Sequence, residues 1–165
     1  LVGSEMCIRD RTVTERYYSP YDKSHPMVTR AAWGFGIETG TQAVRLILSG
    51  IFDRHPKLKI FLGHFGEAIP FWLPRIHESF TRPGNEHIDF KRIFKENFWI
   101  TTSGFFSDNA LELCLKVLNT EKILFAVDWP YANNKVGVDW LANAPIDKHT
   151  KNLIFSENAR NLFNL

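Results

Sequence analysis

The chain has 165 residues, of which 44% are hydrophobic and 23% are charged, and its formal net charge is +2. This balance is typical of a globular domain with a real hydrophobic core. The small, scattered charge argues against a nucleic-acid partner or a membrane-surface partner, and no apolar stretch approaches the roughly 20 residues that cross a bilayer.

Residues 1–10 resemble a translated adapter from DNA library preparation rather than part of a protein. We exclude this artefact from fold reasoning and expect the natural sequence to begin near Arg11, inside a longer protein. Without it, Cys114 is the sole cysteine, so no disulfide can form within the chain. A reducing, cytoplasmic location is therefore expected, with Cys114 filling space in the core.

The first half of the chain predicts a loop followed by alternating helices and strands. Residues 11–36 lack a clear period, and a loop of this length is often a lid, so we assign 11–37 as a lid segment. Apolar residues at helical spacing predict a helix through 43–52, capped by Thr39 or Thr41. A strand over 58–62 follows, and then a helix over 67–80 that is interrupted by Pro70 and Pro74.

The second half continues the alternation. We predict strands at 98–102 and 123–127, with a helix between them that is capped by Ser107. A short helix at 139–142 and two closing helices at 146–155 and 157–163, separated by a cap at Ser156, complete the chain. Repeated strand–helix units imply a parallel sheet, and three strands leave both edges of an open sheet bare. We therefore interpret the chain as part of a larger α/β fold.

Two of the predicted strands end in an ionisable side chain. Residues 59–67 and 122–130 are both apolar runs that finish abruptly, one at His64 and the other at Asp128. Strands that are apolar on both faces are typical of buried parallel sheets, which present their carboxyl ends to ligands. His64 and Asp128 are therefore predicted to share one site.

Glu67 is predicted to join this site by folding back to hydrogen-bond His64, which would fix the imidazole tautomer and raise its basicity. The alternative is a structural His64, with Glu67 merely favouring the start of a helix. A buried Asp128 would need a metal, an arginine or a substrate proton as its partner, or it could simply cap the following turn. Arg75 lies in an apolar helical segment and could pair with Glu67 or another carboxylate, or lie in solvent.

From these residues the chain resembles the metal-dependent aromatic acid decarboxylases of the amidohydrolase superfamily, such as the γ-resorcylate, 2,3-dihydroxybenzoate and 5-carboxyvanillate enzymes. The resemblance extends from about Trp33 to the end of the chain. It rests on six blocks of sequence in the right order: 45–50, 62–67, 73–76, 98–104, 125–131 and 157–163. It implies a TIM-type (β/α)8 barrel, of which residues 38–165 would supply the last three βα units.

The resemblance also implies roles for particular residues. Asp128 would be one ligand of a single divalent ion, zinc or manganese, and would also deliver a proton to the ring carbon. His64 would contact the substrate or a water, with Glu67 as its partner. Arg75 would support this pair, and the segment around Trp33 and Phe35 would cover the ring of a small aromatic acid.

The other metal ligands in such enzymes belong to strands upstream of this chain. We therefore expect an active, homo-oligomeric parent carboxy-lyase and an inactive fragment, because one carboxylate cannot hold a catalytic ion. Two alternatives remain open: a lactonase-type hydrolase of the same superfamily, and a non-catalytic barrel that has lost its metal.

Overall fold

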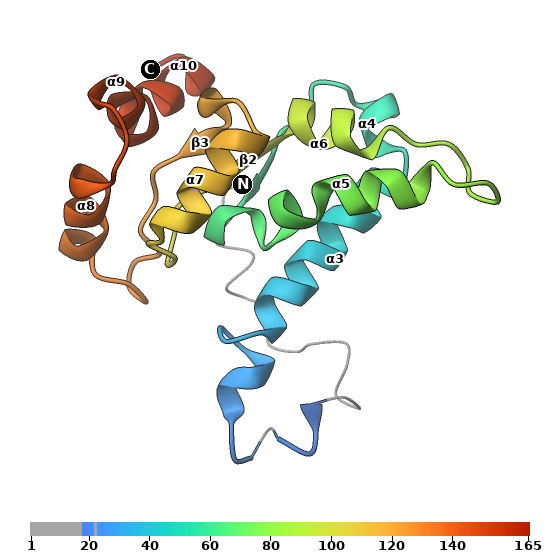
Figure 1. Cartoon of the computed structure of the whole chain (residues 1–165), viewed down its shortest axis with the longest axis horizontal. Helices are drawn as coiled ribbons and strands as arrows, with labels where there is room; N and C mark the ends of the chain where they lie inside the picture. The colour runs from blue at the N-terminus through green and yellow to red at the C-terminus, as the bar shows by residue number, and fades with distance from the viewer. Residues whose placement is uncertain (1–17, 22) are drawn as a thin grey trace.

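The computed structural model describes residues 18–21 and 23–165 (Figure 1). The expectations for residues 1–10, and for the first part of the predicted lid, lie outside this part of the chain. The first element that lies wholly within this part is a 3-10 helix, Pro26–Thr29. Within the described part, no helix combines the length and the apolar character needed to cross a membrane.

A sheet of three parallel strands lies at the centre of the fold. The strands β1 (Ile60–Leu62), β2 (Phe98–Thr101) and β3 (Ile123–Leu124) are adjacent in chain order. Both pairs are parallel, and Ile100 of β2 lies opposite Ile123 of β3. The predicted parallel α/β arrangement is confirmed.

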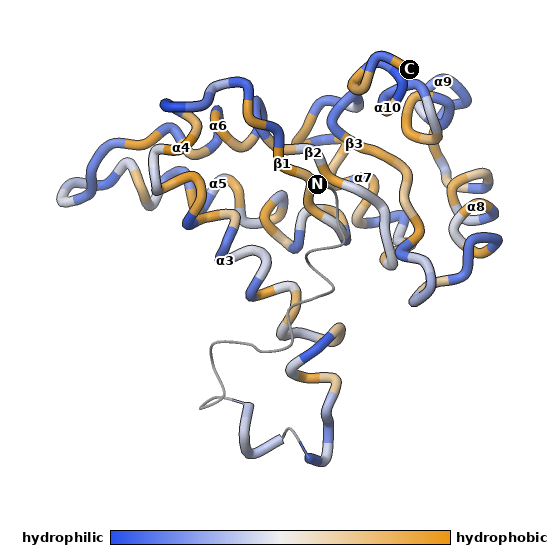
Figure 2. Tube along the Cα trace, turned by 180° about the vertical axis from the view of Figure 1, so that it is seen from behind, coloured by the Kyte–Doolittle hydropathy of each residue, from blue (hydrophilic) through white to orange (hydrophobic). Residues whose placement is uncertain are grey.

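Each strand is shorter than predicted, and the end of β3 shows why. The Thr102 hydroxyl donates to the Ala126 carbonyl at 2.8 Å and accepts from the Ala126 N–H at 3.1 Å. The Phe125 N–H donates to the Ile154 carbonyl, which lies outside the sheet. At Phe125 and Ala126, a helical turn and a side chain therefore take the place of strand-to-strand hydrogen bonds. The hydrophobic run itself continues past β3 (Figure 2).

Helices connect and flank these strands, and α5 and α7 lie in front of the sheet in the view of Figure 1. In chain order the helices are α3 (Gly34–Leu48), α4 (Ile51–Arg54), α5 (Ile69–Phe80), α6 (Phe90–Asn97), α7 (Asp108–Val117), α8 (Asn134–Asn143), α9 (Lys148–Asn152) and α10 (Asn158–Phe163). Short 3-10 helices at His64–Gly66 and Thr120–Lys122, and a π-helical turn at Leu153–Glu157, complete the elements.

The helix before β1 differs from the prediction at both ends. It begins at Gly34, so the predicted loop ends at Trp33 and neither threonine caps the helix. The Thr41 hydroxyl instead donates to the Ile37 carbonyl within the helix, at 2.7 Å. At the other end, Gly50 has a φ of 68°, a conformation that glycine adopts without strain, and it separates α3 from α4.

The prolines of α5 do not break it. Pro70 lies in the first turn, where its missing N–H has no helical partner to lose. Pro74 lies inside the helix, which continues because Ile69 and Leu73 are buried in the core. Tertiary packing outweighs the local penalty of the second proline.

Two features of the other helices were predicted differently. Helix α6 was not predicted, although Asp89 caps it by accepting from the Arg92 N–H at 3.1 Å. Ser156 does not separate two closing helices, because the chain passes from α9 to α10 through the π-helical turn. The predicted Ser107 cap of α7 is confirmed, since its hydroxyl accepts from the Ala110 N–H.

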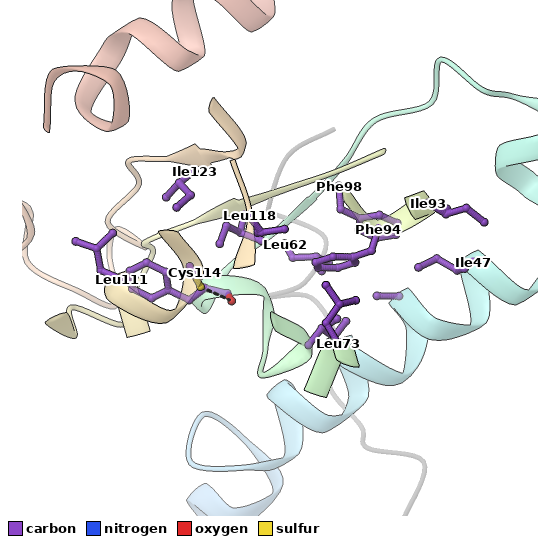
Figure 3. Close-up of a cluster of buried hydrophobic side chains, with 14 of the residues drawn as sticks. Ile47, Leu62, Leu73, Ile93, Phe94, Phe98, Leu111, Cys114, Leu118 and Ile123 are labelled. Atoms are coloured by element: carbon purple, nitrogen blue, oxygen red, sulfur yellow. Dashed lines mark hydrogen bonds between the residues drawn. The ribbon is translucent and has the colours of Figure 1, made fainter. Parts of the chain in front are cut away.

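The hydrophobic core extends between the sheet and the helices that cover it (Figure 3). Phe94 is fully buried, and its ring stacks against Phe90 at 6.4 Å and Phe98 at 5.0 Å. At the other end of the cluster, Leu111 and Cys114 of α7 pack near β3. The core therefore holds the three strand ends in one rigid frame.

Candidate active site

The turn that follows β1 has an unusual backbone. Five successive residues, 64–68, have positive φ values of 49°, 54°, 78°, 53° and 62°. Only the middle one, Gly66, is a glycine, and left-handed conformations cost other residues about 1–2 kcal/mol each. Strained backbone of this kind persists only where the surrounding structure enforces it, and it clusters at functional sites.

This turn brings His64 and Glu67 together. His64 Nδ1 donates to Glu67 Oε1 at 2.7 Å, and the Glu67 side chain is 10% exposed. The predicted hydrogen bond is therefore present, although Glu67 lies in the left-handed turn and not in the first turn of a helix. The contact fixes the imidazole orientation and leaves Nε2 free to face the strand ends.

The electrostatics of the pair favour a protonated imidazole. The hydrogen bond to Glu67 raises the pKa of His64 above its ordinary value of 6.5, and burial opposes this rise. The charges of Glu67 and Asp128 add to the rise in the pKa. His64 can therefore hold a proton in the neutral pH range, where proton transfer is most effective.

Asp128 lies on the other side of His64. Its Oδ2 is 3.7 Å from His64 Nε2, and its side chain is 23% exposed. Asp128 lies four residues beyond the end of β3, in a turn where its φ is 74° and its carbonyl accepts from the Tyr131 and Ala132 N–H groups. It is thus a partly exposed turn residue and not the buried strand end that the sequence predicted.

Gly104 completes the close packing and was not among the predicted site residues. A Cβ atom on this residue would lie 3.0 Å from Asp128 Oδ2 and 3.2 Å from the His64 ring. Its φ is 64°, and its N–H donates to the Val127 carbonyl. The signal was the Ser103-Gly104 turn after β2, because a glycine at a strand end permits close backbone approach.

The lid residues lie at the start of α3. Trp33 precedes the helix and is 54% exposed, while Phe35 is half-buried. One residue further on, a Cβ on Gly36 would lie 2.8 Å from Glu67 Oε2. The structure therefore brings the beginning of α3 against Glu67, although no ring contact to Trp33 or Phe35 is found within residues 18–21 and 23–165.

Arg75 does not join the site within this chain. Its side chain is exposed on α5. A hydrogen bond with Arg82 lowers the pKa of Glu78, and the charge of Arg75 adds to this lowering. Of the two alternatives left open for Arg75, the structure therefore shows the solvent-exposed side chain. A proline-containing helix that starts after the left-handed turn directs Arg75 to solvent.

The described residues contain no group of three or more histidine, cysteine, aspartate or glutamate side chains that could hold a metal ion. Asp128 and His64 supply one carboxylate and one imidazole, which are the right types of donor for zinc or manganese. Catalytic ions need about three protein ligands, so these two make at most part of a site.

Comparison with known proteins defines the class. Residues 13–165 match the amidohydrolase family, so the chain belongs to this family. It is 39% identical to the γ-resorcylate decarboxylase of Polaromonas sp. strain JS666 over 150 residues, which is 88% of this chain and 46% of that relative. The enzyme of the same name from Rhodococcus jostii is 38% identical over 148 residues, or 87% of this chain and 45% of that relative.

Solved structures agree with this assignment. The dihydroxybenzoic acid decarboxylase of Polaromonas sp. JS666, crystallised with manganese and 2-nitroresorcinol, matches with a TM-score of 0.83 and 35% identity. The 5-carboxyvanillate decarboxylase of Sphingomonas paucimobilis matches with a TM-score of 0.80 and 40% identity. Each match covers 92% of this chain and 46% of the other. The chain thus spans about half the length of these relatives.

Proposed function

We propose that this chain is part of a metal-dependent decarboxylase that removes carbon dioxide from a hydroxylated aromatic carboxylic acid. The observation that carries the proposal is the convergence of His64, hydrogen-bonded to Glu67 at 2.7 Å, with Asp128 at the carboxyl ends of parallel strands. The similarity to γ-resorcylate and 5-carboxyvanillate decarboxylases selects this reaction from the others that such a site could perform.

The proposed architecture is the last part of a (β/α)8 barrel, with residues 38–165 as its final three βα units and 11–37 as a lid. The three parallel strands in chain order support it. So does β1, which pairs with β2 alone among the described strands and leaves one edge bare. In this reading, residues 1–10 remain an adapter artefact.

The residues present can manage the protons of this reaction. Loss of carbon dioxide from an aromatic ring requires a proton at the carbon that carried the carboxylate. We assign its delivery to Asp128, and to His64 with Glu67 the task of restoring that proton, because Nε2 of His64 is 3.7 Å from Oδ2 of Asp128. The fixed orientation of the imidazole keeps Nε2 on the Asp128 side.

Asp128 would be one ligand of a divalent ion, zinc or manganese, and residues outside this chain would supply the other ligands. When bound, such an ion would orient the substrate carboxylate and phenol oxygen and withdraw charge from them. Trp33 and Phe35, beside the lid end of α3, would contact the aromatic ring.

We place the protein in the cytoplasm. We also expect a homo-oligomer, because two large apolar side chains on α5, Phe71 and Trp72, are 67% and 44% exposed.

The test is to recover the gene across the junction before Arg11, express the longer protein, and assay 2,6-dihydroxybenzoate and 5-carboxyvanillate with added manganese or zinc. We expect carbon dioxide release from one of them, and a loss of about 100-fold or more in kcat for Asp128→Asn and for His64→Gln. Asp139→Asn, which changes an exposed carboxylate on α8, serves as the matched control.

Two results would contradict the proposal. Decarboxylation by the 165-residue chain alone would show that the upstream ligands are unnecessary. Lactone hydrolysis without decarboxylation by the longer protein would favour the hydrolase alternative.

A further inference from the structure

The left-handed turn at 64–68 includes Phe65, a bulky aromatic residue. A bulky residue with a φ of 54° is rare, since the left-handed region is accessible mainly to glycine, asparagine and aspartate. Two short-range hydrogen bonds close the turn: Gly66 N–H to the Gly63 carbonyl at 2.8 Å, and Glu67 N–H to the His64 carbonyl at 3.3 Å. Local bonds alone do not explain why this conformation persists.

The Phe65 side chain makes long-range contacts that do explain it. The residue is 3% exposed, and its ring meets Phe105 edge-on at a centroid distance of 6.0 Å and Trp140 at 6.1 Å. Such edge-to-face pairs are attractive beyond the area that they bury. Phe105 follows β2, and Trp140 belongs to α8, which follows β3, so the Phe65 ring joins the turn after β1 to the segments that follow the other two strands.

The Phe65 backbone is held as well. The Cys114 thiol on α7 donates to the Phe65 carbonyl, with an Sγ–O distance of 3.8 Å, and this bond is the dashed line in Figure 3. Cys114 is 1% exposed, and burial raises the pKa of its thiol to about 12, so it remains a neutral donor. The carbonyl next to Gly66 is therefore satisfied from outside the turn.

These contacts link the turn to the other half of the site. Phe105 directly follows Gly104, which approaches both His64 and Asp128. Trp140 is itself fixed by a hydrogen bond from Nε1 to Asp108 Oδ1 at 2.8 Å. The contact between Phe65 and Phe105 thus joins the turn that carries His64 to the segment at Gly104, which packs against both His64 and Asp128.

We propose that Phe65 is a positioning residue, which holds the left-handed turn so that the His64 imidazole meets the Glu67 carboxyl. The inference rests on the proposed function for its catalytic meaning, but the geometry that it describes exists without substrate or metal. The competing explanation is that Phe65 is ordinary core filling, whose loss would weaken the whole fold without a particular effect on His64.

The test uses proton NMR of the 165-residue chain at one fixed pH and low temperature. A hydrogen-bonded imidazole N–H exchanges slowly and resonates far downfield, and the signal of His64 is assigned by its loss in Glu67→Gln and in His64→Gln. We expect the signal to disappear in Phe65→Leu, together with loss of amide-exchange protection at Gly66, while circular dichroism shows a folded chain.

Phe90→Leu is the matched control, because it makes the same change in a fully buried ring of α6. It should lower the thermal midpoint comparably and keep the His64 signal. Should Phe65→Leu not fold, Phe105→Leu removes one ring partner at a residue that is 48% exposed, and it should broaden the signal.

Three outcomes would overturn the proposal. The signal could persist in a folded Phe65→Leu chain, it could be lost equally in Phe90→Leu, or it could be absent from the unaltered chain. None of these depends on catalysis, so a failure of the decarboxylase assignment would leave the measurement unaffected, and the two failures can be told apart.

Discussion

The packing under α6 and the turn after β1 are built in opposite ways. Around Phe94, buried aromatic rings stack on a regular helix and strand, and burial alone accounts for the arrangement. At 64–68, ionisable side chains are partly exposed on a backbone that is left-handed at every residue. The comparison shows that the first region supplies stability, while the second is held in a costly conformation that brings His64 and Glu67 into contact.

The largest effect is expected from Phe94→Ala. Truncation of this fully buried ring leaves a cavity between Phe90 and Phe98, and it should lower the free energy of unfolding by about 3–5 kcal/mol in a urea titration. The downfield imidazole signal of His64 should survive in the folded fraction. Its selective loss would mean that the two regions are not independent.

A smaller effect is expected from Gly104→Ala, with Gly84→Ala as its control. Both glycines have positive φ, but a Cβ at Gly84 meets nothing within 4 Å, whereas one at Gly104 meets Asp128 and the His64 ring. We expect losses of about 1–2 kcal/mol at Gly84 and about 2–3 kcal/mol at Gly104 in thermal unfolding. Equal losses would show that only backbone strain matters at Gly104.

Cys114 offers a pH-dependent test of the packing of α7 against the turn at 64–68. Its thiol pKa is raised from 9.0 to about 12, so the folded chain binds this proton more tightly than the unfolded chain does. The corresponding stability is fully present below pH 9 and is lost as the pH rises from 9 towards 12. The burial that raises this pKa can be tested by thiol labelling. In a Cys7→Ser background, iodoacetamide should label Cys114 at pH 8 only as fast as the chain unfolds. Rapid labelling of the folded chain would contradict this expectation.

The smallest effect on stability is expected from Glu67→Gln, which should change its pH dependence most clearly. Because Glu67 raises the pKa of His64, the protonated pair stabilises the fold fully below pH 6.5, and this contribution declines as the pH rises through the raised pKa. The variant should flatten that decline in urea titrations between pH 6 and pH 9. Glu78→Gln, on the exposed face of α5, should leave it unchanged.

Much of the fold could be predicted because its signals are local. The apolar runs near Ile60, Ile100 and Ile123 predicted three parallel strands, and Ser107 predicted the start of α7. Helix α6 was missed because residues 90–97 have only two turns of apolar spacing, although Asp89 offered a cap signal. The early end of β3 depended on the Thr102 hydroxyl, whose partner is 24 residues away.

The candidate site was also predictable only in part. His64, Glu67 and Asp128 could be proposed from ionisable residues that end apolar runs, and the structure places the three together. The position of Arg75 could not be decided from the sequence, because helix periodicity does not show which face of α5 meets the site. Gly104 was not predicted as a site residue, because its importance depends on two residues that are distant in the chain.

The sequence by itself determined the α/β class, the parallel sheet and the chemical identity of the candidate residues, since apolar runs and their polar ends are properties of neighbouring residues. Only the tertiary structure decided the left-handed turn, the 2.7 Å contact between His64 and Glu67, and the approach of Gly104. The physical reason is that non-glycine residues avoid positive φ on their own. Contacts from Cys114, Phe105 and Trp140, which lie 40 or more residues away along the chain, hold Phe65 in that conformation.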